Sequence, residues 1–331
     1  MGEKFRAMHS ELVVNHVKHP WKLVIFASRE SLTMLIRTLK AAQVAARETL
    51  GIDVVINGNR PLALALTNQL DNPELAHEAV PVRVWDIAVG DKANAWNQYV
   101  HQIWAGESIA FFIDGYVRLN PNSIMLLAEA IADKVEVLGG TGVPSGGQTR
   151  DASHPHPTPE NGFHGNFCCI KGTAIAQMRR RKISLPFGLY RVDSLMGALL
   201  TLGLDPVSNV WDGSRIYVHP EASWQTDTKH WWRMSDIRAQ VKRIFRQSRG
   251  VLENLAIRDH LRTRKQPPEL MLANANELIL EWVQRCPVQA NKVLRYNPLA
   301  RRALAEIKQS ADKTKGYDNT TPVLMGYSKT S

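Results

Sequence analysis

Residues 110–121 constrain the fold of this chain more than any other stretch. They begin with four apolar residues, two of them aromatic, and continue into Asp114 and Gly115. A short apolar run of this kind predicts a strand that is buried on both faces, which requires helices or strands above and below its sheet. Ligands of open α/β sheets bind outside the carboxyl ends of the strands, so Asp114 is a candidate ligand-binding group. The alternative is that its carboxylate only caps a local turn.

The N-terminal two thirds of the chain alternates between strand and helix patterns. Such alternation predicts an α/β fold whose largely parallel sheet has helices on both faces. Ser31 precedes one of the helical patterns, where it is suited to cap the helix. We expect strands at 21–28, 52–56, 82–87, 110–113 and 135–138, and helices at 32–50, 62–70, 90–104 and 123–132.

The pattern changes after residue 138. Residues 139–162 are rich in Gly, Pro, Ser, Thr and His, and a long loop of this kind is usually functional or disordered. We interpret it as a lid over a bound ligand, with His154 and His156 either metal ligands or simply exposed. We expect strands at 163–170, 207–210 and 215–219, helices at 173–181 and 194–202, basic helices from 228 onward and a loose polar tail from 311 to 331.

The positive charge of the chain is concentrated near its C-terminus. Between Lys229 and Lys308 there are 17 Lys and Arg but only 7 Asp and Glu, which accounts for the whole net charge of +10. This indicates an anionic partner, namely nucleic acid, lipid headgroups or a phosphorylated substrate, or else a solvated helical surface. Apolar residues between Trp231 and Phe245 recur at helical spacing, as expected for core packing or for a helix lying on anionic lipid.

The cysteines and the N-terminus indicate the compartment. Cys168, Cys169 and Cys286 provide no disulfide framework, and the adjacent pair is typical of small buried hydrophobic residues. No apolar segment is long enough to span a bilayer, and the first residues lack the apolar core of a signal peptide. We therefore expect a cytoplasmic protein, with peripheral contact to the inner face of the membrane as an open alternative.

Motifs at the strand ends resemble those of a known family. Lys92, Ala95 and Asn97 begin the helix after the third strand, and Asp114-Gly115-Tyr116 follows the fourth. Val192-Asp193 comes after Leu185-Pro186 and before a helix. In this order the motifs resemble those of the family-two glycosyltransferases with the GT-A fold, and the resemblance covers residues 21–224. The family usually has a second Asp where this chain has Tyr116, and a base-recognising Asp where it has Asn57.

The resemblance implies a fold and a set of site residues. It implies a GT-A, Rossmann-like, mixed and mostly parallel sheet in residues 1–225, followed by a basic helical region at 226–310 and a flexible tail at 311–331. Asp193 corresponds to the catalytic base of the inverting members, which deprotonates the acceptor hydroxyl. Its alternative role is as the N-cap of the helix that follows. The implied donor-binding residues are Ala27, Glu30, Asn57, Lys92, Asp114, Gly115 and Tyr116.

Positive charge is needed to stabilise the leaving diphosphate. The resemblance allows either a metal ion or basic side chains to supply it. Mn²⁺ or Mg²⁺ held by Asp114 and a distant ligand such as His219 is one expectation, because hard cations prefer oxygen ligands. Because Tyr116 replaces the second acid, a metal-free site with Lys or Arg beside the diphosphate is an alternative, and an inactive site is another.

Three functional hypotheses follow from these observations. The leading one is a hexosyltransferase-type enzyme that transfers one sugar from a UDP-, GDP- or dTDP-linked donor to a glycan, glycolipid or lipid-linked acceptor. The second is a non-catalytic subunit of the same fold that binds a nucleotide sugar or a partner. A nucleic-acid binder ranks last, because the basic C-terminal region carries no recognised nucleic-acid motif.

Overall fold

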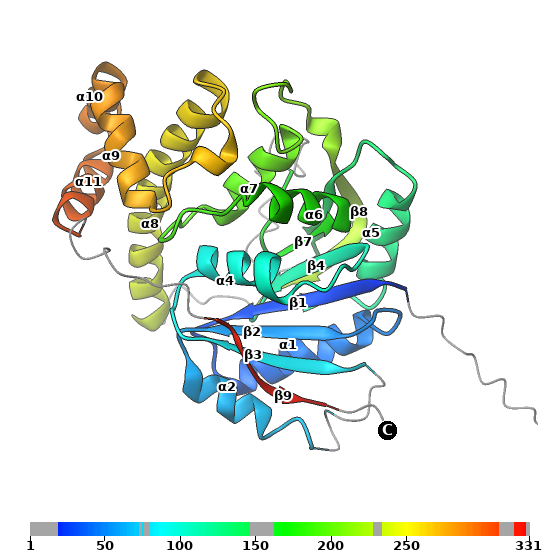
Figure 1. The fold of residues 1–331 in the computed structure, drawn as a ribbon. Helices are drawn as coiled ribbons and strands as arrows, with labels where there is room; N and C mark the ends of the chain where they lie inside the picture. Colours follow the sequence, from blue (N-terminus) through cyan, green and yellow to red (C-terminus); the bar gives the residue numbers. More distant parts are fainter. Residues whose placement is uncertain are drawn as a thin grey trace, which may run out of the picture.

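The computed structural model describes residues 19–72, 75, 80–145, 162–227, 234–310 and 321–328, with the backbone alone for 234–243. In this part of the chain a nine-stranded sheet has the order β5-β8-β6-β7-β4-β1-β2-β3-β9 (Figure 1). The strands are β1 (Trp21–Ala27), β2 (Ile52–Asn57), β3 (Val82–Ile87), β4 (Ile109–Asp114), β5 (Arg118–Leu119), β6 (Gly139–Pro144), β7 (Phe167–Lys171), β8 (Ile216–Gln225) and β9 (Val323–Tyr327).

The sheet is mixed, and one strand near its centre runs antiparallel to both of its neighbours. β1 pairs in parallel with β2 and β4, β2 with β3, and β6 with β8. β7 lies between β4 and β6 and is antiparallel to both. Its pairing sets Phe167 opposite Ile113, so the first residues of β7 lie beside the carboxyl end of β4. The residues just before β7 are therefore neighbours of Asp114.

The helices follow the strands as the alternation predicts. Ser31 caps the first of them by accepting a hydrogen bond from the backbone of Met34 at 3.2 Å, which confirms its predicted role. The helices are α1 (Leu32–Ala45), α2 (Arg60–Thr67), α4 (Lys92–Gln98), η1 (Tyr99–Ile103), α5 (Ser123–Ala132), α6 (Gly172–Arg181), α7 (Val192–Thr201), η2 (Gly213–Arg215), α8 (Met234–Arg258), η3 (Asp259–Thr263), η4 (Pro268–Leu270), α9 (Ala275–Arg285), α10 (Pro287–Tyr296) and α11 (Pro298–Ser310).

Two hydrophobic cores lie on opposite faces of the sheet, which confirms the predicted α/β layering. Side chains of one strand alternate between them: Phe111 packs in the core with α1, α2 and α5, whereas Phe112 packs in the core with α4, α6 and α7. Both rings are almost completely buried, and each contributes about 1.5–3 kcal/mol of hydrophobic stabilisation. The sheet and its two helical layers hold the carboxyl ends of β1, β2 and β4 at one rigid edge.

The C-terminal helices extend the upper helical layer (Figure 1). Leu252 of α8, Trp282 of α9 and Leu304 of α11 belong to the same buried cluster as α4 and α7. The basic helical region therefore packs continuously with the sheet through that layer. The boundary at residue 225 stays a prediction. None of the described helices combines the length and the apolar character needed to cross a membrane.

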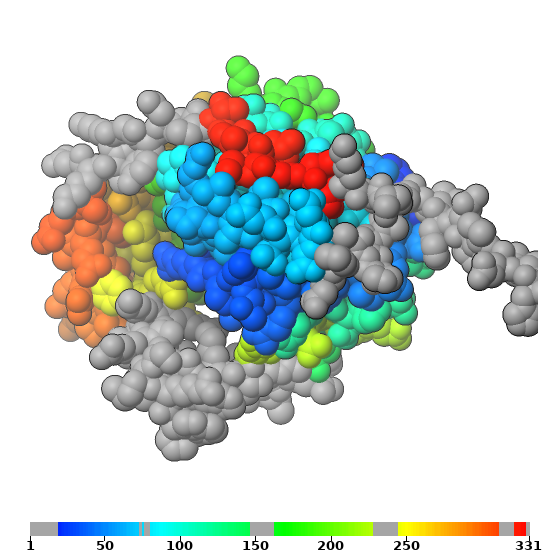
Figure 2. Space-filling view, turned by 90° about the horizontal axis from the view of Figure 1, so that it is seen from below, coloured from blue at the N-terminus to red at the C-terminus, as the bar shows by residue number. Residues whose placement is uncertain are grey.

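The end of the chain differs from the predicted loose tail. Val323–Tyr327 forms β9, which pairs antiparallel with β3 and closes that edge of the sheet. Ser328 extends the pairing through two hydrogen bonds of 2.9 Å with the backbone of Val82. Figure 2 shows β9 lying across the surface beside the cyan and blue segments around α2. Residues 311–320 lie outside the described part of the chain.

Three further sequence predictions require correction. The strand expected at 135–138 lies instead at β6, within residues predicted to be loop. Residues 207–210 form a turn and not a strand, and the strand expected at 215–219 is the first half of the ten-residue β8. The sequence pattern does not predict β6, because its glycines have a low strand propensity. The predicted lid, with His154 and His156, lies outside the described residues apart from its two ends.

Candidate functional site

Asp114 is the last residue of β4, at the centre of the sheet, and two side chains bind its carboxylate. Lys92, the first residue of α4, forms an ion pair with Oδ1, and the Tyr116 hydroxyl donates to Oδ2 at 3.0 Å. The Asp114 side chain is only 14% exposed, whereas that of Lys92 is 38% exposed. Burial works to lower the pKa of Lys92, but the Asp114 carboxylate outweighs it and raises that pKa. Lys92 is therefore a fixed cation at neutral pH.

Asp193 joins this cluster from α7. Its negative charge also raises the pKa of Lys92, after the larger effects of burial and Asp114. A Cβ built on Gly165 would lie 3.2 Å from the Asp193 Cβ, so the segment before β7 packs directly on this residue. Helix α7 begins at Val192 with Arg191 as its N-cap, so Asp193 lies in the first turn and does not cap the helix. Two carboxylates from distant segments thus act on one lysine.

His164 and Asn166 complete the cluster, and the sequence did not single them out. The backbone N–H of Asn166 donates to Nδ1 of His164 at 3.3 Å, so the proton of the neutral ring is on Nε2. Burial lowers the pKa of His164 despite the opposing charges of Asp193 and Asp114. The Asn166 side-chain oxygen lies 3.1 Å from the Tyr116 hydroxyl. The site therefore contains a neutral imidazole N–H donor beside its two acids.

The turn after β1 supports the same edge of the sheet. Glu30 accepts hydrogen bonds from the backbone N–H groups of Ser28 at 2.7 Å and Arg29 at 2.9 Å. Gly115 lies against this turn, since a Cβ there would come within 2.9 Å of the Ala27 Cβ and 3.3 Å of the Glu30 side chain. Any larger residue at position 115 would displace the neighbours of Asp114, which explains the glycine.

Asn57 has a structural role at the end of β2. Its side chain is buried, and its amide donates to the Ala27 carbonyl at 3.0 Å. The Ser28 hydroxyl in turn donates to the Asn57 carbonyl at 2.8 Å. Asn57 therefore joins β2 to the turn after β1, and its role in recognising a nucleotide base stays a prediction.

A divalent cation does not fit the donor set that the described residues provide. Lys92 and Tyr116 already engage both oxygens of Asp114, and a second cation would be repelled by the Lys92 ammonium. His219 lies on β8, from which β4 is separated by β6 and β7, and its Nδ1 accepts from the backbone of Glu221 and Ala222 at 3.1 Å. Within the described ranges no three His, Cys, Asp or Glu side chains gather as metal ligands would.

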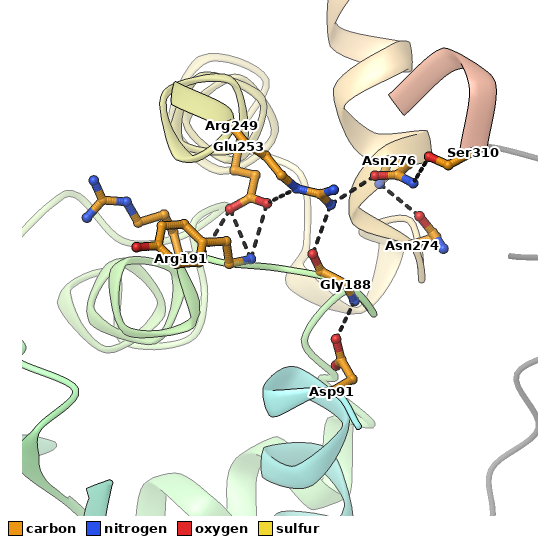
Figure 3. A network of polar contacts seen from close by, with 9 residues as sticks. Asp91, Gly188, Arg191, Arg249, Glu253, Asn274, Asn276 and Ser310 are labelled. Carbon is orange, nitrogen blue, oxygen red and sulfur yellow. Dashed lines mark hydrogen bonds and ion pairs between the residues drawn. The ribbon is translucent and has the colours of Figure 1, made fainter. Parts of the chain in front are cut away.

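A polar network fixes the loop that leads into α7 (Figure 3). The buried Glu253 carboxylate of α8 accepts from the backbone N–H groups of Tyr190 at 3.1 Å and Arg191 at 3.0 Å. Arg249 donates to the Glu253 carboxylate and to the Gly188 carbonyl, each at 2.9 Å. From the opposite side, Asp91, the N-cap of α4, accepts the Gly188 N–H at 2.9 Å. The C-terminal helices thereby position the segment that carries Asp193.

The two adjacent cysteines contribute to the core and not to the site. Cys168 and Cys169 are completely buried in β7, on opposite faces of the sheet. Burial raises the pKa of both thiols, which keeps them protonated and unreactive. Their predicted role as small buried hydrophobic residues is confirmed.

Comparisons with known proteins give distant structural similarities. No family model and no curated protein matches the chain. The similar solved structures include three that are 12–13% identical to this chain. A Pyrobaculum calidifontis mannosyltransferase in complex with GDP-Man and Mn²⁺ has a TM-score of 0.49, over 90% of this chain and 88% of that one. TarS 1–349 of S. aureus in complex with UDP scores 0.46, over 90% and 93%. The 4-diphosphocytidyl-2C-methyl-D-erythritol synthase of Anaerococcus prevotii scores 0.41, over 69% and 98%.

Proposed function

We propose that the protein is an inverting glycosyltransferase that uses a nucleoside-diphosphate sugar, with UDP, GDP or dTDP as the nucleotide. The observation that carries the proposal is the ion pair of Lys92 with Asp114 at the carboxyl edge of the sheet, within electrostatic reach of Asp193. An acid and a fixed cation at this place meet the two requirements of sugar transfer, which are removal of a proton from the acceptor and stabilisation of a leaving diphosphate. A non-catalytic nucleotide-sugar-binding subunit is the second candidate, favoured by Tyr116 in place of the second acid that the family usually has.

The mechanism assigns one step to each group. The Asp193 carboxylate takes the proton of an acceptor hydroxyl, whose oxygen attacks the anomeric carbon of the donor sugar. The bond from that carbon to the diphosphate oxygen breaks, and the diphosphate departs with the electron pair. The Lys92 ammonium has three N–H donors, of which Asp114 uses one, so others are available to the departing oxygens. Attack on the face opposite the leaving group inverts the anomeric configuration.

The acceptor is proposed to be a hydroxyl of a glycan, glycolipid or lipid-linked sugar. A panel of UDP-, GDP- and dTDP-sugars tests the donor half of the proposal, because a ligand that binds the native state raises the melting temperature. We expect one nucleotide class to raise it and the others to leave it unchanged. Equal effects of all three, or of none, would contradict a specific donor site.

We expect donor binding without a divalent cation. In excess EDTA the wild-type protein should keep its donor-induced shift, because Lys92 supplies the positive charge. Replacing Lys92 with Met should weaken donor binding about 10- to 100-fold, the range for loss of a charged hydrogen bond of about 1.5–3 kcal/mol. Calorimetric titration of each protein checks this, with the exposed Lys292→Met as control. Binding that appears only with Mn²⁺ or Mg²⁺ would contradict the metal-free site.

We also propose that the protein docks on anionic lipid through a basic tip formed by α10 and α11. Val288 is 84% exposed and Tyr296 75% exposed beside several cations, a combination suited to a lipid interface. Nucleic acid remains the less favoured partner. The exposed cations of the basic tip are Lys292, Arg295, Arg301, Arg302 and Lys308.

Charge reversal tests the basic tip. Each Lys or Arg near an anionic surface contributes about 1 kcal/mol, so the double variant Arg295→Glu, Arg301→Glu should lower vesicle affinity at least about tenfold. Co-sedimentation with phosphatidylcholine vesicles, with and without phosphatidylglycerol, provides the measurement. The exposed double variant Arg180→Glu, Arg258→Glu, outside α10 and α11, is the control with the same net charge. Equal loss in the control, or wild-type binding that does not require phosphatidylglycerol, would contradict the assignment.

A further inference from the structure

A cavity of about 570 Å³ has three walls. They are formed by α4 together with η1, by the segment before α7 and by the start of α9. Its volume falls within the range of roughly 300–1,000 Å³ typical of small-molecule sites. Neither Asp114 nor Asp193 lines it, so it is distinct from the proposed donor site. No step of the mechanism above uses it.

The polar part of the cavity wall is mostly uncharged. Amide, imidazole and hydroxyl groups supply both donors and acceptors, and Leu185 and Phe187 add apolar surface. The charged lining residues are one cation, Lys182, and one anion, Glu277, so the wall favours neither sign of charge. This chemistry suits a neutral polyhydroxylated ligand, whose hydroxyls pair with the amides. The polar lining side chains include Asn94, Asn97, Gln98, His101, Ser184 and Asn274.

Gln98 gives an independent indication of a ligand. It lines the cavity from α4 and is only 5% exposed, yet its side-chain oxygen has no hydrogen-bond partner among the described residues. A buried acceptor left unsatisfied costs about 1–3 kcal/mol, and such groups are rare in native proteins. A hydroxyl donor from a bound molecule, met by a small rotation of this side chain, would satisfy it. A residue of the cavity wall therefore carries a buried acceptor that is unsatisfied among the described residues.

The cavity is built from fixed parts. The Asn97 side chain binds both backbone groups of Leu185, accepting from its N–H at 2.8 Å and donating to its carbonyl at 2.9 Å. The Phe187 N–H donates to the Ala273 carbonyl at 2.7 Å, and the Phe187 carbonyl accepts from Ala275 at 2.9 Å. Two helices thus hold the intervening segment from both sides. A preformed wall lowers the entropic penalty of binding a flexible ligand.

We propose that this cavity is a saccharide-binding site with room for a neutral di- or trisaccharide. Binding at the cavity requires nothing of the donor site. The proposal rests on the proposed function in one respect only: the bound saccharide would be a remote part of the acceptor glycan. Failure of one proposal therefore leaves the other standing, and the two are measured separately.

The test uses maltotriose, cellotriose, mannotriose and chitotriose as probes in saturation-transfer NMR and calorimetric titration. We expect at least one to bind the wild-type protein. Gln98→Leu should weaken that trisaccharide at least about tenfold while leaving the urea midpoint of unfolding unchanged or higher, because it removes an unsatisfied acceptor. A merely structural role of Gln98 predicts no change in binding.

Two further variants keep the test decisive. Ala273→Trp, at an exposed position of the cavity wall, should block binding sterically even if Gln98→Leu were to misfold. Gln289→Leu on the exposed face of α10 is the matched control and should bind as the wild type does. Donor-induced melting shifts should be the same in all variants. Absence of binding by every trisaccharide, or wild-type affinity in Ala273→Trp, would overturn the proposal.

Discussion

Replacement of Asp193 with Asn should abolish most sugar transfer while leaving donor binding intact. A positioned general base typically contributes about 10²- to 10⁴-fold to a rate, and Asn has nearly the same shape without the ability to take a proton. Asp193 also lies in the first turn of α7, where a negative charge adds about 0.3–1 kcal/mol of helix stability. The variant should therefore lose little stability and unfold only slightly earlier in urea. The measurement is release of nucleoside diphosphate at saturating donor.

The comparison variant for this prediction is Asp133→Asn, which removes an exposed acid at the end of α5. It should retain wild-type turnover. A drop in turnover of Asp193→Asn that simply follows a loss of donor binding would show that Asp193 binds donor and does not act as the base. Unchanged turnover would assign the base to another group.

Replacement of Glu253 with Ala should be the most destabilising single change in the network of Figure 3. The Glu253 side chain is completely buried and pairs with Arg249, so its loss leaves a half-buried guanidinium without its anion. It also leaves the N–H groups of Tyr190 and Arg191 without their acceptor. Removal of one partner of a buried ion pair typically costs about 3–5 kcal/mol. Urea unfolding measures the free energy, and turnover should fall as α7 loses its orientation.

The chain provides a matched control for this change. Arg302 and Glu306 of α11 form an Arg–Glu pair with the same four-residue spacing, but their side chains are 71% and 54% exposed. Exposed pairs of this type contribute about 0.3–0.5 kcal/mol, so Glu306→Ala should lower stability by no more than that. Similar effects of Glu253→Ala and Glu306→Ala would contradict the role assigned to the buried network.

The sequence was sufficient to predict the parallel part of the fold. Apolar runs such as the one ending at Ile113 predicted buried strands, and Ser31 predicted a helix start, because both signals are local in the chain. The same signals predicted that Asp114 would lie at the carboxyl end of its strand. Lys92 and Asp193 are predicted from their motif positions, and in the structure Lys92 pairs with Asp114 while the charge of Asp193 acts on Lys92.

The rest depended on long-range pairing that no local pattern reports. The antiparallel insertion of β7 brings His164 to Asp114, although 50 residues separate Asn166 from its contact Tyr116. Strand β9 lies in the predicted polar tail because its pairing is remote in the chain, with Ser328 bonded to Val82 246 residues earlier. The role of Glu253 was not visible either, since it holds a backbone loop 62–63 residues away in the chain.

The most direct test of the central claim is donor turnover by the purified protein in EDTA. UDP-, GDP- and dTDP-sugars would be incubated separately, and released nucleoside diphosphate and free sugar would be measured over time. We predict slow hydrolysis of one donor class, with loss of hydrolysis in Asp193→Asn and donor binding about 10- to 100-fold weaker in Lys92→Met. If no nucleotide sugar is bound or cleaved under any condition, the protein is not the transferase proposed here.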